Sequence, residues 1–365
     1  MKNTEIAKRI DDASKNNSLT FFVGAGVSKC SGIPLWSELI EEICKKMKME
    51  VPKNLSSDDY LRIPQMFYYT CEDSKDYSAF IKTVIDKPDA VPNAVHHLML
   101  KFHPASFLTT NYDHLLENAA VEYGQSYKSV VKDEEVASIN GDRFILKVHG
   151  DIEHGNFVLK EEDYLAYEDK FKLISPLLRS VFSTNTVVFI GYGIGDYNVK
   201  LILDGVRRVL KEKFEPIFIR VDEKPLSDEE QKYYESRGLN VIEYSKVTTP
   251  EERALINKND YEARYVAVLN YICTVTKEKL LGENDEESFT NLYNRLLPLD
   301  RLSALRISDI QERLSQCCNI SNMGVVYLQK GKEGLFKKFI SIHELLTDDR
   351  KKNVGKRSKK VQPNS

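Results

Sequence analysis

The sequence has few of the features that mark secreted, membrane-spanning or zinc-stabilised proteins. Its six cysteines contain no C-x-x-C pair, no apolar run approaches the length of a spanning helix, and the N-terminus has no signal-peptide core. These absences disfavour a disulfide framework, a zinc ribbon and a membrane span. They predict a cytoplasmic protein with reduced cysteines and no membrane partner.

A surplus of positive charge is also missing from most of the chain. The 365 residues carry a net charge of −3, but residues 350–365 hold seven basic and no acidic residues, so residues 1–349 carry −10. A globally basic nucleic-acid binder is therefore disfavoured. The basic tail 350–365 is predicted to be disordered, and a solvated terminus is favoured over a nucleic-acid contact.

Short apolar runs recur along the first two thirds of the chain and indicate the strands of a buried parallel sheet. They lie at 19–23, 106–109, 144–148, 187–190, 217–221 and 241–244. Helical periodicity lies between them at 113–122, where Asp113 is the expected cap, and at 196–213, where Asp196 is. The alternation predicts an α/β fold, a Rossmann-like doubly wound parallel sheet over residues 1–245.

Two further regions surround this predicted sheet. The stretch 36–105 is too long for a simple crossover and predicts a helical insertion, with helices at 36–49, 59–70 and 93–101. After Lys246 strand signals become rare, which predicts a mainly helical C-terminal domain over 246–349. Its expected elements are helices at 250–281 and 285–297 and a hairpin at 324–342. Two domains also agree with the length of the chain.

Glycines follow the first predicted strand, in the string Gly24-Ala25-Gly26-Val27-Ser28. A glycine turn between a strand and a helix lets the backbone approach a phosphate, and the helix N-terminus adds positive potential. A plain strand-to-helix turn would explain the string about half the time, and the third glycine of the usual dinucleotide fingerprint is missing. The string alone therefore leaves a phosphate site and a structural turn open.

Polar residues and glycines also follow three more predicted strands. They are Asn111 and Asp113, then His149, then Gly191, Tyr192 and Gly193. Taken singly, Asp113 could cap a helix and His149 could be a structural histidine. In a parallel sheet the carboxyl ends share one edge, so their convergence favours a ligand site. A metal is not expected, because His96, His97, His103 and His114 lack ligand spacing with carboxylates.

These strings together resemble the sirtuin signature. GAGVSKCSGIP is similar to the pattern G-A-G-x-S-x-x-S-G-I-P, TTNYD stands where sirtuins have T-Q-N-I-D, and VHG matches the sirtuin catalytic His-Gly. Order, spacing and strand context agree over roughly residues 15–245. The resemblance implies a site for NAD.

The resemblance also implies a role for each matched residue. Asn111 would hold a water molecule and the ribose, and His149 would be the base. The residues implied to bind the rest of NAD are Gly24, Ala25, Gly26 and Ser28 at the diphosphate, Ile33 and Trp36 at the loop over the nicotinamide ribose, Asp113 at the carboxamide, Gly191, Tyr192 and Gly193 toward the adenosine, and Asp222 near the adenine ribose.

The departures from the sirtuin pattern narrow the expected activity. Leu35-Trp36-Ser37 stands where deacylating sirtuins have Asp-Phe-Arg, and the zinc module of two C-x-x-C pairs is missing. What is kept is the NAD-cleaving part of the sirtuin pattern without the part that handles a peptide. This combination is similar to the sirtuin-like domains of bacterial anti-phage defence proteins, as in Thoeris effectors or the sirtuin partners of HerA-type ATPases. The resemblance implies an NAD+ hydrolase that yields nicotinamide and ADP-ribose. Protein deacylation and non-catalytic sensing of NAD or ADP-ribose stay open as alternatives.

An ungated NAD+ hydrolase would harm its own cell, so we expect its activity to be controlled. Residues 246–349 carry no visible chemistry. They are the candidate region for homo-oligomer contacts, or for docking onto a partner ATPase of the HerA type or a sensor protein.

Overall fold

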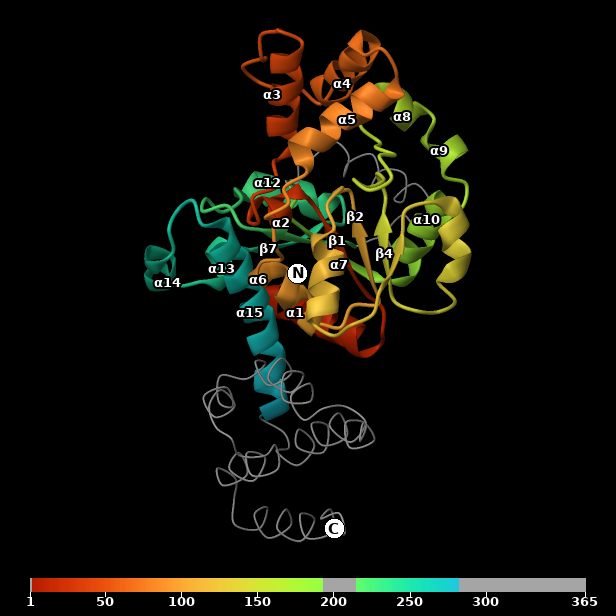
Figure 1. Cartoon of the computed structure of the whole chain (residues 1–365). Helices are drawn as coiled ribbons and strands as arrows, with labels where there is room; N and C mark the ends of the chain where they lie inside the picture. Colours follow the sequence, from red (N-terminus) through yellow and green to blue (C-terminus); the bar gives the residue numbers. More distant parts are fainter. Residues whose placement is uncertain (1, 193–214, 282–365) are drawn as a thin grey trace, which may run out of the picture. The chain divides into compact units, whose positions relative to one another are not determined.

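Seven parallel strands form one sheet in the order β3-β4-β2-β1-β5-β6-β7 (Figure 1). The structure is a computed structural model that describes residues 2–192 and 215–281. The strands are β1 (Leu19–Val23), β2 (Ser106–Thr109), β3 (Lys128–Val130), β4 (Phe144–Lys147), β5 (Thr186–Ile190), β6 (Ile217–Arg220) and β7 (Asn240–Glu243). The α/β class and the six predicted strands are confirmed. The short strand β3 was missed, because of its three residues only Val130 is buried.

Strand β1 lies at the centre of the sheet, with β2, β4 and β3 on one side and β5, β6 and β7 on the other. The order in which the chain adds strands therefore reverses at β1. In open parallel sheets, ligands bind outside the carboxyl ends of the strands at such a reversal. This topology places the expected crevice beside Gly24, the first residue after β1.

Helices cover both faces of the sheet, and successive residues of β1 point into the two different cores. Phe21 packs into one core and Phe22 into the other, as the two-residue period of a strand requires. The first core lies under α1 (Asn3–Lys15), α6 (Ala94–Lys101), α7 (Leu115–Glu122) and α15 (Tyr261–Leu281). The second core includes α10 (Ile174–Thr184), which supplies Leu178 and Phe182.

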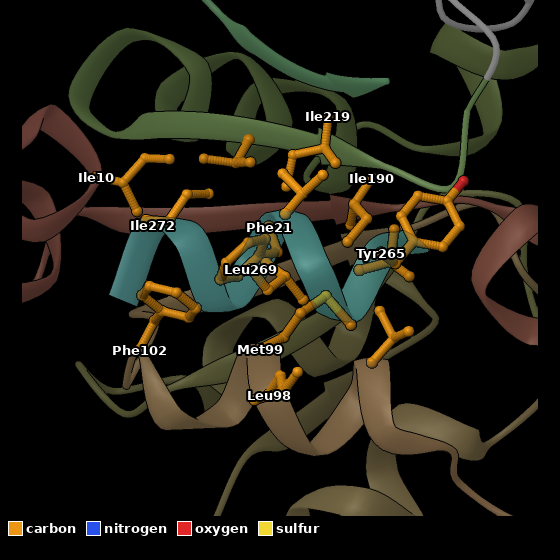
Figure 2. Close-up of a cluster of buried hydrophobic side chains, with 14 of the residues drawn as sticks. Ile10, Phe21, Leu98, Met99, Phe102, Ile190, Ile219, Tyr265, Leu269 and Ile272 are labelled. Carbon is orange, nitrogen blue, oxygen red and sulfur yellow. The ribbon is translucent and has the colours of Figure 1, made fainter. Parts of the chain in front are cut away.

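The helix α15 is part of the first core. Tyr265, Val268, Leu269 and Ile272 are all buried there, and α15 contacts both α1 and α6. Figure 2 shows Leu269 and Ile272 between the sheet and the side chain of Met99 on α6. The described part of the segment after Lys246 therefore packs on the sheet. The function predicted for residues 246–349 in oligomer or partner contacts stays a prediction.

The predicted insertion supplies three helices with a core of their own. These are α3 (Trp36–Lys46), α4 (Asp59–Thr70) and α5 (Ser74–Ile85), and their buried side chains pack with Tyr112 and Phe157. Figure 1 shows the three helices together, beyond the carboxyl ends of β2 and β4. Because Tyr112 directly follows Asn111, this helical group is anchored beside the predicted site.

The remaining described helices are short. They are α2 (Ala25–Lys29), the 3-10 helix η1 (Asp133–Ser138), α8 (Glu161–Leu165), α9 (Tyr167–Lys170), α12 (Asp228–Ser236), α13 (Tyr244–Val247) and α14 (Pro250–Leu255). Within residues 2–192 and 215–281, every helix is too short or too polar to cross a membrane. The predicted helices 196–213 and 285–297, the hairpin 324–342, the tail 350–365, Gly193 and Asp196 lie outside the described residues.

Candidate active site

The glycines after β1 allow two strand ends to approach each other closely. The Gly26 amide donates a 2.9 Å hydrogen bond to the Gly191 carbonyl, which follows β5. A Cβ atom on Gly24 would lie 2.7 Å from that same carbonyl oxygen, and one on Gly26 would lie 2.8 Å from it. Gly24 and Gly26 are therefore required by backbone packing on Gly191, which is a different reason from the predicted approach to a phosphate.

Asn111 follows β2 and is held by hydrogen bonds from two sides. Its amide N–H donates to Thr109 Oγ1 over 2.9 Å, and Thr109 Oγ1 in turn donates to the Val23 carbonyl at the end of β1. Its Nδ2 atom donates to Ser28 Oγ over 2.9 Å. The Oδ1 atom of Asn111 is buried, and it has no hydrogen-bond partner among the described residues. The side chain is thus oriented at one end and has an unused acceptor at the other.

His149 follows β4, the strand that pairs with β2. The register pairs Thr109 with Lys147, so Asn111 and His149 both lie two residues beyond a paired position. The imidazole is buried and contacts the rings of Trp36 and Tyr164 edge-on, at centroid distances of 5.9 and 5.5 Å. Its Nδ1 atom is buried without a partner in the part of the chain that the structure describes.

Burial controls the charge of this histidine. Loss of solvation lowers the pKa of His149 to about 3, against a smaller opposing effect of Asp163. His149 is therefore neutral at neutral pH, with one ring nitrogen able to accept a hydrogen bond.

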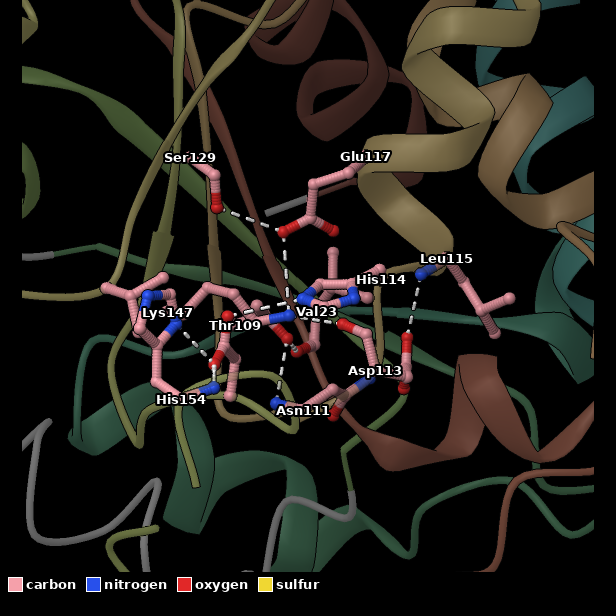
Figure 3. A network of polar contacts seen from close by, with 12 residues as sticks. Val23, Thr109, Asn111, Asp113, His114, Leu115, Glu117, Ser129, Lys147 and His154 are labelled. Atoms are coloured by element: carbon pink, nitrogen blue, oxygen red, sulfur yellow. Dashed lines mark hydrogen bonds and ion pairs between the residues drawn. The ribbon is translucent and has the colours of Figure 1, made fainter. Parts of the chain in front are cut away.

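A polar network lies beside these two residues and fixes the loop after β2 (Figure 3). The Lys147 side chain is fully buried; its Nζ donates to the Asp113 carbonyl and lies 3.5 Å from Glu117 Oε1. Asp113 Oδ1 accepts a hydrogen bond from the Leu115 amide over 3.1 Å, where α7 begins. The prediction that Asp113 is the N-cap is wrong, because α7 begins at Leu115 and His114 is its N-cap; Asp113 bonds the first turn from one residue earlier. The other carboxylate oxygen of Asp113, Oδ2, is buried and has no partner among the described residues.

Two histidines converge on Asp151, two residues after His149. Asp151 accepts hydrogen bonds from His114 Nε2 over 3.2 Å and from His154 Nδ1 over 2.8 Å. Burial acts to raise the pKa of Asp151, but these hydrogen bonds outweigh it and hold that pKa well below its usual range. Single ligand atoms of His114, Asp151 and Glu153 lie within 4.8 Å of one another, a spacing that a metal ion could use. The hydrogen bonds already account for the geometry of His114 and Asp151.

Two hollows lie along the carboxyl edge of the sheet. A large pocket of about 1270 Å³ is lined by residues that include Ala25, Gly26, Trp36, Gly191, Tyr192 and Asp222. A small cavity of about 30 Å³ is lined by residues that include Ala25, Ser28, Ile33, Trp36, Asn111 and Asp113. Ala25, Leu35 and Trp36 line both. The small cavity has room for about one water molecule.

Most of the predicted site residues thus lie along one of these two hollows. Gly24 and His149 line neither, although Gly24 packs on Gly191 and His149 contacts Trp36. Part of the wall of the large pocket was not predicted from the sequence; it includes Lys29, Arg220, Asn257, Asn259, Asp260 and Glu262. The pairing of His114 with Asp151 was not predicted either, because 37 residues separate them in the chain.

The chain is similar in sequence to several known proteins. The chain is 36% identical over 349 residues to "Defense-associated sirtuin 2" of Bacillus subtilis, an alignment that covers 93% of this chain and 34% of that protein. It is 26% identical over 258 residues to "NAD(+) hydrolase ThsA" of Enterococcus faecium, covering 66% of this chain and 53% of the relative. The protein of that name from Bacillus cereus (strain MSX-D12) is 30% identical over 193 residues, an alignment that covers 51% of this chain and 39% of the relative.

The chain therefore spans about a third to a half of the length of these curated relatives. Among solved structures, a chain described under "Structural Basis for the Mechanism and Regulation of Sir2 Enzymes" aligns with a TM-score of 0.37 and 10% identity, over 75% of this chain and 98% of that one. The family model of the SIR2-like domain matches residues 105–242, which hold both Asn111 and His149. Residues 105–242 thus match the SIR2-like domain, in agreement with the sirtuin signature in the sequence.

Proposed function

We propose that the protein is an NAD+ hydrolase that releases nicotinamide and ADP-ribose, and that it acts as a gated effector of bacterial anti-phage defence. The match to the SIR2-like domain and the similarity to "Defense-associated sirtuin 2" and "NAD(+) hydrolase ThsA" support this assignment. The observation that carries it is the pair of unsatisfied buried atoms, Asn111 Oδ1 and His149 Nδ1, at neighbouring strand ends.

These two atoms are costly unless something binds to them. A buried polar group without a partner destabilises a protein by about 1–3 kcal/mol, and within the described residues both atoms lack one. Structural amides and imidazoles are normally satisfied when buried. A water molecule and a ribose hydroxyl are donors of the kind that both acceptors need.

The chemistry of NAD+ suits such a site. Nicotinamide leaves as a neutral molecule from a cationic pyridinium, so cleavage of its C–N bond needs little acid assistance. Positive charge then develops on the ribose, as in other glycoside cleavages. Water forms the new bond to the anomeric carbon and gives up a proton. We assign the positioning of that water to Asn111 and acceptance of the proton to His149.

Under this proposal the arrangement in this structure is inactive, because Trp36 covers His149. The Trp36 ring lies against the imidazole, and a pKa of about 3 makes His149 a weak base. The small cavity beside Asn111 is also too small for a nicotinamide riboside. Movement of Trp36 would open this cavity toward the large pocket and hydrate His149. The loop from Ser31 to Pro34, which leads into Trp36, is the proposed moving part.

The other predicted roles place the rest of NAD+ in the large pocket. Gly26, Gly191 and Tyr192 line it near β1 and β5, where the diphosphate is proposed to lie. Asp222 follows β6 and is proposed to lie near the adenine ribose. The pocket volume of about 1270 Å³ is large enough for a dinucleotide.

The direct test is incubation of the purified full chain with NAD+ alone, followed by chromatography of the products. Nicotinamide and ADP-ribose should form in equal amounts. Asn111→Ala and His149→Ala should each lower turnover by at least about 100-fold. The exposed Asn118→Ala and the half-buried His97→Ala are matched controls that should keep wild-type turnover.

The alternatives give different results in the same experiment. Turnover that requires an added acetylated peptide would identify a deacylase. Binding of NAD+ in a calorimeter without any product would identify a sensor. A His149→Ala protein with wild-type turnover would remove His149 from its assigned role.

We also propose that residues beyond the sheet control the enzyme through oligomer contacts or docking onto a partner ATPase or sensor protein. A chain that ended at residue 249 would lose the buried side chains of α15, so a truncation should follow residue 283. Light scattering of the full chain and of residues 1–283 tests the proposal. If the full chain and residues 1–283 formed oligomers with the same number of subunits, a role of residues 284–365 in self-association would be contradicted.

A further inference from the structure

Histidine and carboxylate side chains gather where the loop after β2 meets the loop after β4. His114 Nε2 lies 3.2 Å from Asp151 Oδ2, and single ligand atoms of His114, Asp151 and Glu153 all lie within 4.8 Å of one another. The sequence predicts no metal, because its histidines lack ligand spacing with carboxylates. That reason does not hold for His114, since the fold brings it a carboxylate from 37 residues away. The cluster lies outside both hollows, so the roles proposed for NAD+ do not use it.

Backbone hydrogen bonds hold the two loops together at this cluster. The Ile152 amide donates to the Tyr112 carbonyl over 3.0 Å, which ties the loop after β4 to the loop after β2. The Gly155 amide donates to the Asp151 carbonyl over 3.1 Å and closes the turn after β4. His114 and Asp151 are therefore kept close by the backbone as well as by their own hydrogen bond. A site that is formed in advance loses less entropy when a ligand binds.

The two carboxylate oxygens of Asp151 have different surroundings. Oδ1 accepts a 2.8 Å hydrogen bond from the His154 amide and another 2.8 Å hydrogen bond from His154 Nδ1. Oδ2 has only His114 Nε2 as a partner among the described residues. Carboxylates that bind a metal are commonly held by hydrogen bonds of this outer kind. His154 thus orients Asp151, and Oδ2 is the atom that faces the cluster.

Hydrogen bonds explain the positions of His114 and Asp151, but they do not explain that of Glu153. Glu153 is exposed, and within residues 2–192 and 215–281 no hydrogen bond or ion pair holds its carboxylate. The side chain can therefore turn toward the other two and supply a third ligand atom.

The distances and the types of donor atom suit zinc. Bonds of about 2.0–2.1 Å in a tetrahedral arrangement place neighbouring ligand atoms about 3.3 Å apart. The 3.2 Å between His114 Nε2 and Asp151 Oδ2 agrees with this spacing. An imidazole nitrogen beside carboxylate oxygens suits zinc, whereas magnesium and calcium prefer oxygen atoms alone. Three protein ligands leave the fourth position of the tetrahedron to a water molecule.

The local charge also suits a divalent cation. Asp151 and Glu153 together carry two negative charges, which balance those of a zinc ion bound by a neutral His114. Lys147 is the cation whose charge acts on both His114 and Asp151. Its Nζ lies 3.5 Å from Glu117 Oε1, so a carboxylate outside the cluster offsets that charge.

We propose that His114, Asp151 and Glu153 bind a zinc ion that joins the loops after β2 and β4. Asn111 and His149 belong to the same two loops, but neither is a ligand. The ion holds the loops together and takes no step in the cleavage of NAD+. The inference therefore goes beyond the proposed function and does not depend on it.

The test is a calorimetric titration of the full-length protein with ZnCl2, after treatment with a chelator and with the cysteines kept reduced. A His114→Gln/Glu153→Gln double variant should bind zinc at this site at least about 100-fold more weakly than the wild type. It keeps the buried Asp151, and Glu153→Gln alone is a second variant at an exposed position. His154→Gln removes only the outer hydrogen bond to Asp151 and should weaken binding about tenfold.

His97→Gln is the matched control. His97 Nε2 lies 3.3 Å from Glu122 Oε2, so it also belongs to a histidine–carboxylate pair, but that pair has no third ligand among the described residues. Its zinc affinity should equal that of the wild type. MgCl2 in place of ZnCl2 should give no binding at this site, and equal affinity for the two ions would overturn the assignment to zinc.

Two further measurements show whether the ion joins the loops. Zinc should raise the Tm of the wild type more than that of the double variant, because the ion binds the folded chain. Exchange of the Ile152 amide hydrogen should become slower with zinc in the wild type only. Equal zinc affinity in the wild type and the double variant would overturn the site. An Ile152 exchange rate that bound zinc leaves unchanged would overturn the joining of the loops.

Discussion

The Nδ2 atom of Asn111 donates a 2.9 Å hydrogen bond to Oγ of Ser28, and both side chains are buried. Ser28 belongs to α2, which follows β1, whereas Asn111 follows β2. The bond therefore joins the ends of two adjacent strands. It also decides which end of the Asn111 amide carries the acceptor, because Nδ2 is engaged and Oδ1 is not.

Replacing Ser28 by alanine should misorient Asn111 without removing it. We expect Ser28→Ala to lower kcat/KM for NAD+ about tenfold, since small displacements of a positioning group are costly in catalysis. The unfolding free energy should fall by about 1 kcal/mol, the contribution of one hydrogen bond. Steady-state kinetics and urea unfolding measure the two effects.

Ser183→Ala is the matched control for Ser28→Ala. Ser183 is exposed on α10 and donates only to the Ser180 carbonyl within its own helix. Its loss should leave kcat/KM unchanged. A Ser28→Ala protein with wild-type kcat/KM would show that Asn111 does not depend on this bond.

Trp36 keeps His149 out of water, and its removal should change the acidity of that histidine. Burial is the main reason why the pKa of His149 is lowered to about 3, and the Trp36 ring lies 5.9 Å from the imidazole. Trp36→Ala should hydrate the ring and move the pKa upward, toward the usual value near 6.5. Trp36→Phe keeps an aromatic cover and should move it less.

A titration of the histidine ring resonances by NMR measures this change directly. Assignment of the His149 signals follows from their loss in a His149→Gln protein. A Trp36→Ala protein in which His149 still titrates near pH 3 would mean that the cover comes from elsewhere, for example from Tyr164.

The strand ends of this site could be predicted from the sequence because they depend on local patterns. Apolar runs fixed six of the seven strands, and a parallel sheet brings their carboxyl ends to one edge. Asn111 and His149 both follow such runs, and the register of β2 and β4 places them at equal depth. The sirtuin strings then supplied the roles that the spacing alone left open.

The rest of the site depends on contacts between distant segments, which no local pattern encodes. Asn257 and Asp260 line the large pocket only because α15 folds back onto the sheet. His114 meets Asp151 only because α7 begins beside the end of β4. The prediction for Gly24 was also incomplete. The sequence shows that a glycine leaves space after β1, but it does not show that the Gly191 backbone fills that space.

Buried histidines should make the fold sensitive to mild acid. Burial lowers the pKa of His96 to about 4, against a usual value near 6.5. Below pH 6.5 the unfolded chain therefore binds a proton that the folded chain does not, so stability falls as the pH falls. From pH 7 to pH 5 the loss from such a group is about 2 kcal/mol.

Urea unfolding of a His96→Gln variant at pH 7 and pH 5 isolates this contribution. The variant should lose about 2 kcal/mol less than the wild type between the two pH values. Hydrogen bonding from His114 to Asp151 raises the pKa of His114, so this pair stabilises the fold more as the pH falls. The effect is the same in the wild type and in the His96→Gln variant, so it cancels when the two are compared. His97→Gln is the control on the same helix. Parallel losses in His96→Gln and wild type would contradict the prediction.

Gly191 offers the sharpest test of how the strand ends fit together. Its φ is +80°, and an added Cβ would lie 2.6 Å from the Gly24 carbonyl oxygen. Gly141 has almost the same conformation, with φ of +82°, but nothing lies within 4 Å of its Cβ position. The pair therefore separates backbone strain from steric contact, since only Gly191 has both.

We expect Gly141→Ala to lower the unfolding free energy by about 1 kcal/mol, the cost of a left-handed conformation for alanine. Gly191→Ala should lower it by about 3 kcal/mol or more, because the turn after β1 must also move. It should abolish NAD+ binding as well, since Gly26 and Gly191 are hydrogen-bonded and line the same pocket. Equal losses of stability in the two variants would mean that the close approach of Gly24 and Gly191 contributes nothing beyond the dihedral angle.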